Sequence, residues 1–453
     1  CLDGQVEGLR LDKVRTFLGT GAKTSREIQL RLGLSQPTVS RLVSRLGAEI
    51  IVLGRGPATR YALTRDIRDL GSDFPVYRVD EDGNVHVLGH LHTLRGGQYW
   101  WVDDSDVGHL YNYLPWFIQD MRPDGFSGRA FALRQNRELD LPRRLNEWSD
   151  DHVLIALARR GEDITGNIII GDESLERYLE STRDEQFVVR FEDRAEIYPR
   201  LAKAAIEGDP AGSSAAGEQP KFTVLLQNGN YCHVLVKFSP VTNTPEGVRW
   251  ADLLICEHLA LETIKEAGLR APESRIILSE GRAFLEVSRF DRVGEHGRLP
   301  MISLTAVDHE FLGALDNWAA TSGYLENEKM ISHEDADQMR WLYAFGALIA
   351  NTDMHSGNLS LIYRRNDHFD LAPIYDMLPM MFRPVDGTVP DRNYTVPSPR
   401  KETMRQWDSA LESAITFWEK VVAEERLSDD FREICKTVCT KVLSVTSGPR
   451  VIV

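Results

Sequence analysis

The chain has 453 residues, of which 42% are hydrophobic and 27% are charged, and it carries a net charge of −15. This is the composition of an ordinary globular protein, and the length exceeds the ~250–300 residues at which a single core stops growing, so more than one domain is expected. No apolar stretch approaches the ~18 residues that span a bilayer and no signal-peptide pattern occurs, which argues against a membrane protein and favours a cytoplasmic one.

The charge is divided unevenly along the chain. Residues 1–70 contain 12 Lys and Arg against seven Asp and Glu, a net charge of +5, and the remainder carries −20. Because duplex DNA is densely negative, a basic head on an acidic body predicts that only the head meets nucleic acid.

The head predicts three helices followed by two short β runs. A capping box of Thr24 and Glu27 begins the second helix, which ends at Gly33, and Ser35 is placed to cap the third. The third helix has a polar outer face and a buried apolar stripe of Val39, Leu42, Val43 and Leu46. This order resembles a winged helix-turn-helix over residues 1–72, with a small protein-binding helical domain as the alternative.

A recognition helix reads DNA with side chains that reach base edges and phosphates. The predicted DNA contacts are Gln36, Thr38, Ser40, Arg41 and Arg45 on the third helix, and Arg55 and Arg60 near the tip of the β runs. Winged helices usually bind operators as two copies about a two-fold axis, so a homodimer is expected.

Residues 73–185 alternate strand-like and helix-like pieces without a sharp motif, and we assign them to an accessory subdomain. The loop at 208–221 is the richest in small residues along the chain. It is not a Walker A loop, because Glu218 and not Lys follows Gly217. Its glycines and alanines still allow backbone N–H groups to approach a phosphate closely.

A lysine and a glutamate stand out in the next segments. Residues 231–239 alternate like a strand that carries Lys237, and a helix over 250–269 places Glu257 within an apolar stripe. A buried glutamate is costly unless it finds a partner, and Lys237 is the obvious one. The pair alone fits a structural ion pair as well as a functional one.

Polar side chains interrupt the apolar runs of residues 349–378. A helix beginning at Ser332 leads into a loop with Asp353 and Asn358 five residues apart, and two strand-like runs follow, the second ending at Asp376. Phosphoryl transfer from ATP needs a carboxylate that accepts the proton of the attacking hydroxyl, and an amide oxygen and a second carboxylate that hold Mg²⁺. Protein kinases space their base and Asn in the same way, but here His355 follows the Asp, and D-F-G and A-P-E are absent.

Five short motifs occur in this order along the chain: SAAGEQPK at 214–221, VKFS at 236–239, LEVSRFDR at 285–292, NTDMHSGN at 351–358 and APIYDM at 372–377. In this order the chain resembles the HipA family, bacterial serine/threonine kinases best known as toxins of toxin–antitoxin systems. The fused head makes it most similar to the single-chain, YjjJ-like branch, whereas typical HipA toxins depend on a separate DNA-binding antitoxin. The resemblance implies an α+β, bilobal protein-kinase-like fold, with an N-lobe at 186–295, a helical C-lobe at 296–453 and ATP bound between them.

The resemblance also implies roles by position. Asp353 would be the catalytic base, with His355 supporting its loop, and Asn358 and Asp376 would be Mg²⁺ ligands. The residues implied to bind ATP through the phosphate loop, the strand lysine, the adenine hinge and the metal are Ala216, Gly217, Glu218, Gln219, Lys221, Lys237, Ser288, Arg289, Phe290 and Asn358. Ser214, or the adjacent Ser213, falls where the family carries a serine whose autophosphorylation switches the kinase off.

The sequence therefore predicts an ATP- and Mg²⁺-dependent serine/threonine protein kinase of HipA type, self-regulated by autophosphorylation and carrying its own operator-binding module. Relatives in the family modify aminoacyl-tRNA synthetases, so the expected substrate is a synthetase or another translation factor. Two alternatives stay open. One is a small-molecule phosphotransferase, which uses a similar D-x-x-x-x-N, and the other is a DNA-binding regulator whose inactive kinase domain only senses ATP.

Overall fold

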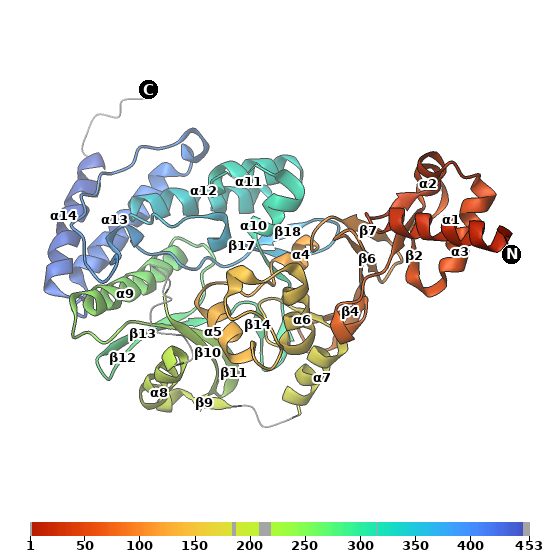
Figure 1. Ribbon diagram of the computed structural model, residues 1–453. Helices are drawn as coiled ribbons and strands as arrows, with labels where there is room; N and C mark the ends of the chain where they lie inside the picture. The colour runs from red at the N-terminus through yellow and green to blue at the C-terminus, as the bar shows by residue number, and fades with distance from the viewer. Residues whose placement is uncertain (1, 184–186, 208–218, 315, 447–453) are drawn as a thin grey trace.

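The computed structural model describes residues 2–183, 187–207, 219–314 and 316–446. Figure 1 shows the N-terminal helices at one end of the molecule and the C-terminal helices at the opposite end. Two five-stranded sheets lie between these ends, one in a middle region and one in the chain that follows it. None of the helices in these ranges is long and apolar enough to cross a membrane.

Three helices and a small antiparallel sheet form the N-terminal region. The helices are α1 (Leu2–Leu18), α2 (Ser25–Leu32) and α3 (Gln36–Leu46), and the strands lie in the order β1 (Lys23–Thr24), β3 (Arg60–Leu63), β2 (Ile50–Leu53). The predicted capping box is confirmed, because Thr24 accepts from the backbone N–H of Glu27 and the Glu27 carboxylate accepts from the backbone N–H of Thr24. The four apolar residues predicted for the third helix are buried.

The turn between α2 and α3 departs from the prediction in one detail. Gly33 ends α2 in the left-handed region at φ 65°, where glycine is favoured. Ser35 stands at the N-cap of α3, but its side chain does not cap the helix backbone. Its hydroxyl lies 2.9 Å from the hydroxyl of Thr38, and this contact replaces the expected cap.

The middle region is an antiparallel sheet covered by helices. Its strands lie in the order β7 (Gly108–Tyr111), β6 (Tyr99–Asp103), β5 (Val85–Thr93), β4 (Asp73–Val79), β8 (Ile168–Ile170). The helices are α4 (Trp116–Gln119), α5 (Gly125–Gln135), α6 (Asp150–Arg160) and α7 (Asp172–Ser181). The consecutive residues of α6 from Val153 to Ala158 are all buried, so this helix forms the centre of the region's core.

The N-terminal region packs directly on the middle region. Leu53 and Ala62, from β2 and β3, share a buried apolar cluster with Leu94, which follows β5. Arg65 donates two hydrogen bonds to the Asp151 carboxylate in the first turn of α6, at 2.5 and 2.9 Å. Buried side chains and a bidentate ion pair therefore fix the two regions to each other.

The second five-stranded sheet has helices on both faces. Its strands lie in the order β12 (Ser274–Ser279), β13 (Arg282–Ser288), β11 (Asn230–Phe238), β10 (Lys221–Asn228), β9 (Val188–Arg190), and only the pair of β9 with β10 is parallel. Phe284 of β13 packs in the cluster that contains α8 (Arg194–Glu207), whereas Leu285 packs in the cluster that contains α9 (Pro245–Glu266). Because side chains alternate along a strand, the two helices cover opposite faces.

A short hairpin and a small sheet lead into the C-terminal helices. The hairpin is β14 (Arg292–Val293) with β15 (Gly297–Arg298), and the antiparallel sheet is β16 (Met301–Ser303), β17 (Ser360–Tyr363) and β18 (Phe369–Leu371). The helices are α10 (Leu304–Val307), α11 (Trp318–Asn327), α12 (His333–Leu348), α13 (Trp407–Ala423) and α14 (Asp429–Thr446). Side chains of α9 and of α11 to α14 belong to one buried cluster, so α9 joins the second sheet to the helical region. The mixed α+β organisation that the sequence predicts is confirmed.

Candidate active site

A polar loop, residues 351–358, follows the buried helix α12. The helix ends at Leu348, and Ala350 takes the left-handed conformation at φ 62°, which costs an L-residue about 1–2 kcal/mol. The Ala350 carbonyl accepts a hydrogen bond from the backbone N–H of Met381 at 3.1 Å, which holds the turn in place. The chain thus leaves the helix abruptly and delivers the polar loop to the start of β17, as the sequence predicts.

The loop brings Asp353 and Asn358 together. The Asn358 side-chain amide donates to the Asp353 carbonyl at 2.8 Å and lies 3.5 Å from the carboxylate oxygen Oδ2. Within the described ranges, no residue donates a hydrogen bond to Oδ1 of Asn358. This oxygen is therefore available as a ligand for a hard cation.

His355 shapes the same loop. Its Nδ1 accepts a hydrogen bond from the backbone N–H of Gly357 at 3.1 Å and so begins a short 3₁₀ turn. Trp318 donates from Nε1 to the His355 carbonyl at 2.9 Å, which anchors the loop to α11. His355 thus lies where the sequence places a residue that supports the loop of Asp353.

A buried asparagine that the sequence analysis did not single out joins Asp353 to Asp376. The Asn351 Oδ1 accepts from the backbone N–H of Asp353 at 3.0 Å, and its Nδ2 donates to the carbonyl of Asp376 at 3.3 Å. Asp376 itself sits in the left-handed region at φ 52°. Asn351 therefore sets the two carboxylate-bearing segments in one arrangement, and the only local signal for it is its place two residues before Asp353.

Lys237 lies near the end of β11 and meets two carboxylates. Its Nζ contacts Glu257 of α9 at 2.5 Å and also forms an ion pair with Asp376. The side chains of Lys237 and Glu257 are 5% and 1% exposed, so the predicted partnership is confirmed as a buried one. Burial alone would lower the pKa of Lys237, but the charges of Asp376 and Glu257 outweigh it and raise that pKa.

The pKa of Asp376 is also set by burial and by nearby charges, but each acts in the direction opposite to its effect on Lys237. Burial would raise it, but the positive charges of Lys237 and Lys221 more than offset burial and lower the pKa below its usual value. Asp376 is therefore ionised at neutral pH and presents an anionic oxygen to the cavity.

Two lysines face each other across neighbouring strands. Lys221, the first residue of β10, is directly opposite Lys237 in the antiparallel register of β10 and β11. Like charges in directly opposed positions destabilise a sheet, because their Cβ atoms lie only ~4.5–5.5 Å apart. The arrangement is favourable where anions gather, as the Glu257 and Asp376 carboxylates do beside Lys237.

Part of the predicted phosphate loop lies outside the residues that the structure describes. These residues are Ala216, Gly217 and Glu218, together with the serines Ser213 and Ser214. Gln219 is described, and its side-chain Nε2 donates to the carbonyl of Phe238, next to Lys237 in β11. The end of the loop is thereby placed beside the two lysines.

One cavity of about 760 Å³ contains the two lysines and Asp376. Its apolar wall includes Leu235 of β11 and Val287 of β13, and the predicted hinge residues Ser288, Arg289 and Phe290 also line it. Cavities of ~300–1,000 Å³ hold ligands of cofactor size. The cavity therefore has an apolar end for a ring system and a charged end for phosphates.

Tyr375 connects the hinge to the polar loop. Its ring stacks on Phe290 with centroids 6.0 Å apart, and its hydroxyl lies 2.7 Å from the Ser360 hydroxyl and donates to the Gly357 carbonyl at 3.2 Å. The tyrosine thus joins the hinge, which lines the cavity, to the polar loop. The sequence analysis did not assign it a role, although it precedes Asp376 in the APIYDM motif.

The residues present fit ATP with Mg²⁺. The facing lysines suit a polyphosphate. The carboxylate of Asp376, in the cavity, and the amide oxygen of Asn358, in the loop that Asn351 ties to Asp376, are the kinds of oxygen ligand that Mg²⁺ prefers. In the part of the chain that the structure describes, no three His, Cys, Asp or Glu side chains are grouped to hold a metal ion. The donor set agrees with a cation that takes its remaining ligands from phosphates and water.

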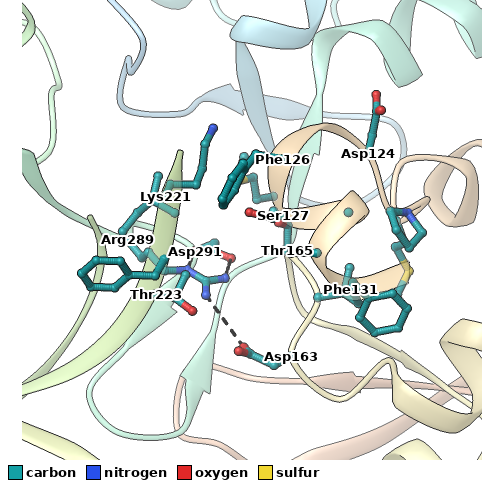
Figure 2. A pocket seen from close by; sticks show the side chains of 18 of the residues that line it. Asp124, Phe126, Ser127, Phe131, Asp163, Thr165, Lys221, Thr223, Arg289 and Asp291 are labelled. Atoms are coloured by element: carbon teal, nitrogen blue, oxygen red, sulfur yellow. Dashed lines mark hydrogen bonds and ion pairs between the residues drawn. The ribbon is translucent and has the colours of Figure 1, made fainter. Parts of the chain in front are cut away.

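The middle region forms a second wall of the cavity, which the sequence did not predict. Figure 2 shows Phe126 and Ser127 of α5 across from Lys221 and Thr223 of β10. Asp163, in the segment after α6, lines the same cavity. A local pattern could not have indicated this wall, because its residues precede the hinge by more than 100 positions.

The residues predicted to contact DNA lie on the surface of the N-terminal region. Gln36, Ser40, Arg41, Arg45, Arg55 and Arg60 are exposed, and Thr38 is partly exposed. Arg41 and Arg45 form ion pairs with Glu7 of α1 at 3.3 and 3.0 Å, and Arg55 pairs with Asp106 of the middle region. Exposed ion pairs contribute little to stability, so these pairs do little to fix the positions of the arginines.

Two family descriptions match the chain. The family described as "YjjJ-like toxin, middle domain" matches residues 70–179, and the one described as "HipA-like C-terminal domain" matches residues 213–445. The first match coincides with the middle sheet and its helices. The second covers most of the second sheet, the polar loop and the C-terminal helices.

Individual relatives agree with these matches. The chain is 35% identical over 440 residues to "Toxin YjjJ" of Escherichia coli (strain K12), a match that covers 96% of this chain and 98% of that protein. One chain of the Shewanella oneidensis MR-1 HipA, HipB and operator DNA complex superimposes with a TM-score of 0.53 at 13% identity, over 82% of this chain and 96% of that chain. At this identity the superposition shows the fold alone, a HipA-like fold. The family that the motifs predict is confirmed, and the chain belongs to the HipA family, in its YjjJ-like branch.

Proposed function

We propose that this protein is an ATP- and Mg²⁺-dependent serine/threonine protein kinase of HipA type. The observation that carries the proposal is the convergence of three separate segments: Asn351 ties the loop of Asp353 to Asp376, and Lys237 pairs with Asp376 beside the cavity. A purely structural ion pair would need neither a second lysine opposite Lys237 nor a carboxylate loop held at its side. Membership of the HipA family supports the same assignment.

Each residue then has a chemical task. ATP would supply the phosphoryl group that is transferred. The Asp353 carboxylate accepts the proton of the substrate hydroxyl, and Asn358 and Asp376 hold Mg²⁺. Lys237 and Lys221 bind phosphate oxygens in positions that the sheet fixes in advance, so little reorganisation is needed when the nucleotide enters.

The similarity to a protein named as a toxin supports inhibition of the kinase by autophosphorylation. The Escherichia coli relative is named a toxin, and a kinase that harms its own cell requires an inactive state. We place the modified residue at Ser214 or the adjacent Ser213, in the small-residue loop that precedes Lys221. The proposed external substrate is a protein, with an aminoacyl-tRNA synthetase or another translation factor as the first candidate.

Intact-mass measurement after incubation with Mg²⁺-ATP tests the kinase directly. We expect one added phosphate on the native protein, mapping to Ser214 or Ser213, because these serines precede the lysines that bind the phosphates. An Asp353→Ala variant should gain no mass. Ser213→Ala and Ser214→Ala variants identify which hydroxyl is modified, and the double variant should stay unmodified.

Other results would select the alternatives. ATP binding without phosphate on any residue, or on an added protein, would replace the kinase with a regulator that senses ATP. Rapid ATP consumption that needs an added small alcohol and leaves proteins unmodified would indicate a small-molecule phosphotransferase.

We infer a second function, DNA binding, from the N-terminal region. The order of its helices and strands and the exposed polar face of α3 support a winged helix-turn-helix, with α3 as the proposed recognition helix and β2–β3 as the proposed wing. The HipA relative from Shewanella oneidensis is found in a complex with HipB and operator DNA. We propose that here the fused region itself contacts an operator, as a two-fold dimer.

Fluorescence anisotropy of full-length protein with duplex DNA from upstream of its gene tests this second function. Binding should weaken steeply as salt increases, and an Arg41→Ala/Arg45→Ala variant should reduce the slope of log K against log salt by about one for each phosphate that the variant no longer binds. Arg364→Ala is the matched control, because Arg364 is an exposed arginine paired with Asp370 in the kinase region. Equal weakening in control and variant, or no binding by native protein, would contradict the assignment.

A further inference from the structure

Asp163, in the middle-region wall of the cavity, combines a fixed position with an available oxygen. Its Oδ1 lies 3.0 Å from Nη2 of Arg292 and 3.8 Å from Nη1 of Arg289. No residue in the described ranges donates a hydrogen bond to its Oδ2, and the side chain is 63% exposed although Arg292 is buried and Arg289 is only 12% exposed. One carboxylate oxygen is therefore anchored, and the other can accept a hydrogen bond from a ligand in the cavity.

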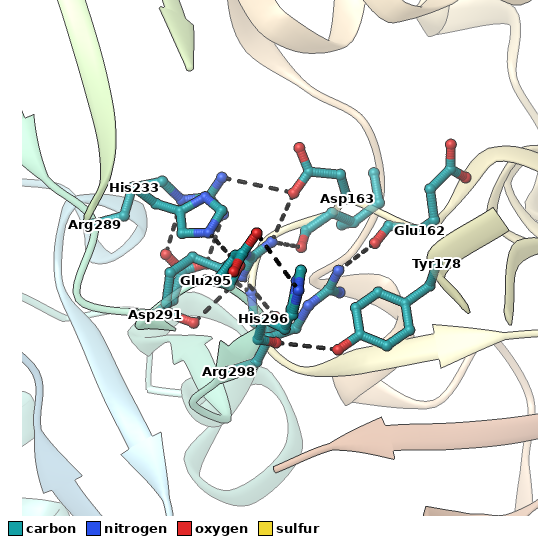
Figure 3. Close-up of polar contacts among 12 residues, drawn as sticks. Glu162, Asp163, Tyr178, His233, Arg289, Asp291, Glu295, His296 and Arg298 are labelled. Atoms are coloured by element: carbon teal, nitrogen blue, oxygen red, sulfur yellow. Dashed lines mark hydrogen bonds and ion pairs between the residues drawn. The ribbon is translucent and has the colours of Figure 1, made fainter. Parts of the chain in front are cut away.

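The segment that carries Asp163 is held on the hinge by a network of polar contacts, shown in Figure 3. Arg292 donates to the carbonyls of Ile164 and Gly166 at 2.8 and 2.9 Å, and the Gly166 N–H donates to the Asp291 carboxylate at 3.1 Å. Backbone atoms just C-terminal to Asp163 are thus tied to the residues that follow the hinge. The carboxylate needs no rearrangement to meet a ligand there.

The two arginines that hold Asp163 flank Phe290 of the hinge. The backbone N–H groups of Ser288 and Arg289 are already bonded, at 2.8 Å each, to the carbonyls of Glu273 and His233. Among the described residues the N–H of Phe290 has no hydrogen-bond acceptor, so it can receive the edge of a purine. The sugar attached to that purine would lie between the hinge and the phosphate-binding lysines, in the cavity that Asp163 also lines.

We propose that Asp163 binds the ribose of the nucleotide, with its Oδ2 accepting a hydrogen bond from a ribose hydroxyl. The proposal rests on the ATP site described above and adds a residue from outside the HipA-like C-terminal domain. The nucleotide site is then built jointly by the kinase lobes and the middle region. Asp163 is a specificity residue that favours ribonucleotides over analogues that lack the hydroxyls.

Isothermal titration with three nucleotides tests the contact. ATP, 2′,3′-dideoxy-ATP and purine riboside triphosphate, which lacks the exocyclic amine, are titrated with Mg²⁺ into the native protein and into Asp163→Ala. We expect the native protein to prefer ATP over dideoxy-ATP by about tenfold or more, as for a hydrogen bond to a charged acceptor. In Asp163→Ala this preference should fall close to one, while the preference for ATP over the riboside stays unchanged.

Two further variants guard the interpretation. Asp69→Ala removes another exposed carboxylate, which does not line the cavity and pairs with Arg159 at 2.6 Å. This variant should retain the native preference for ATP over dideoxy-ATP. Asp163→Asn, which keeps the shape of the side chain, replaces Asp163→Ala if that variant folds poorly. Its preference for ATP over dideoxy-ATP should lie between that of the native protein and one.

The possible outcomes distinguish a failure of the ribose contact from a failure of the proposed kinase function. If Asp163→Ala weakens ATP and dideoxy-ATP equally, the residue is only structural and the proposal fails while the ATP site stands. Loss of the preference for ATP over the riboside would place the contact on the base and also overturn the ribose assignment. If the native protein binds none of the nucleotides, the proposed kinase function fails first, and the ribose contact fails with it.

Discussion

An Asp353→Asn variant is expected to bind ATP as the native protein does but to transfer phosphate about 10²–10⁴-fold more slowly, the range that a positioned general base contributes. The substitution keeps the size of the side chain and the backbone carbonyl to which Asn358 donates at 2.8 Å, so the loop should retain its shape. An amide oxygen, however, does not take up the proton of the attacking hydroxyl. Single-turnover formation of ADP and phosphoprotein measures the rate, and titration with ATP measures binding.

Asp391→Asn provides the control for that experiment, because Asp391 is an exposed aspartate of the same C-terminal region. It should leave both rate and affinity unchanged. A native rate in Asp353→Asn would remove Asp353 from the reaction. A matched loss of rate and of ATP affinity would instead assign it a role in binding.

Lys237→Met should be the most destabilising single change in the site. It leaves Glu257 buried at 1% exposure without a cation, and removing one partner of a buried pair costs about 3–5 kcal/mol of unfolding free energy. Replacing both partners, in Lys237→Met/Glu257→Leu, should recover the part of that loss that comes from Glu257, because Asp376, the remaining partner of Lys237, is 27% exposed and is solvated by water. Neither variant should bind ATP, because both lack the strand lysine.

Urea unfolding followed by circular dichroism measures these stabilities, and titration with ATP measures binding. Lys420→Met is the matched control, since Lys420 pairs with Glu266 on the surface, and exposed pairs of this kind are worth about 0–1 kcal/mol. Native stability in Lys237→Met would show that the pair is hydrated and not buried. Recovery of ATP binding in the double variant would remove Lys237 from the nucleotide site.

Short segments of sequence predicted the parts of the site that neighbouring residues determine. The loop with Asp353 and Asn358 and the hairpin that follows it lie within one stretch, so their spacing could be read directly. The pairing of Lys237 with Glu257 could be predicted as well. A glutamate buried in an apolar stripe is costly without a cationic partner, and Lys237 lies on the strand that precedes the helix.

Contacts between distant segments could not be predicted in this way. The role of Asn351 depends on where the fold places Asp376, and the role of Asp163 depends on Arg292, which belongs to another sheet and another part of the chain. Neither contact leaves a periodicity or a motif at the position itself. Ser35 shows the same limit at short range, because a hydroxyl at a correctly predicted N-cap found the Thr38 hydroxyl in place of the backbone.

The packing of Leu53 and Ala62 against Leu94 has a consequence for dosage. A separate regulatory subunit is gained or lost as its concentration changes, and its own turnover can alter the ratio of the two proteins. Here the N-terminal region is covalently joined and buried against its neighbour, so its local concentration does not fall on dilution. Every molecule carries one copy of the N-terminal region. Fluctuations in expression therefore change the amount of protein in a cell but not the ratio of this region to the rest of the chain.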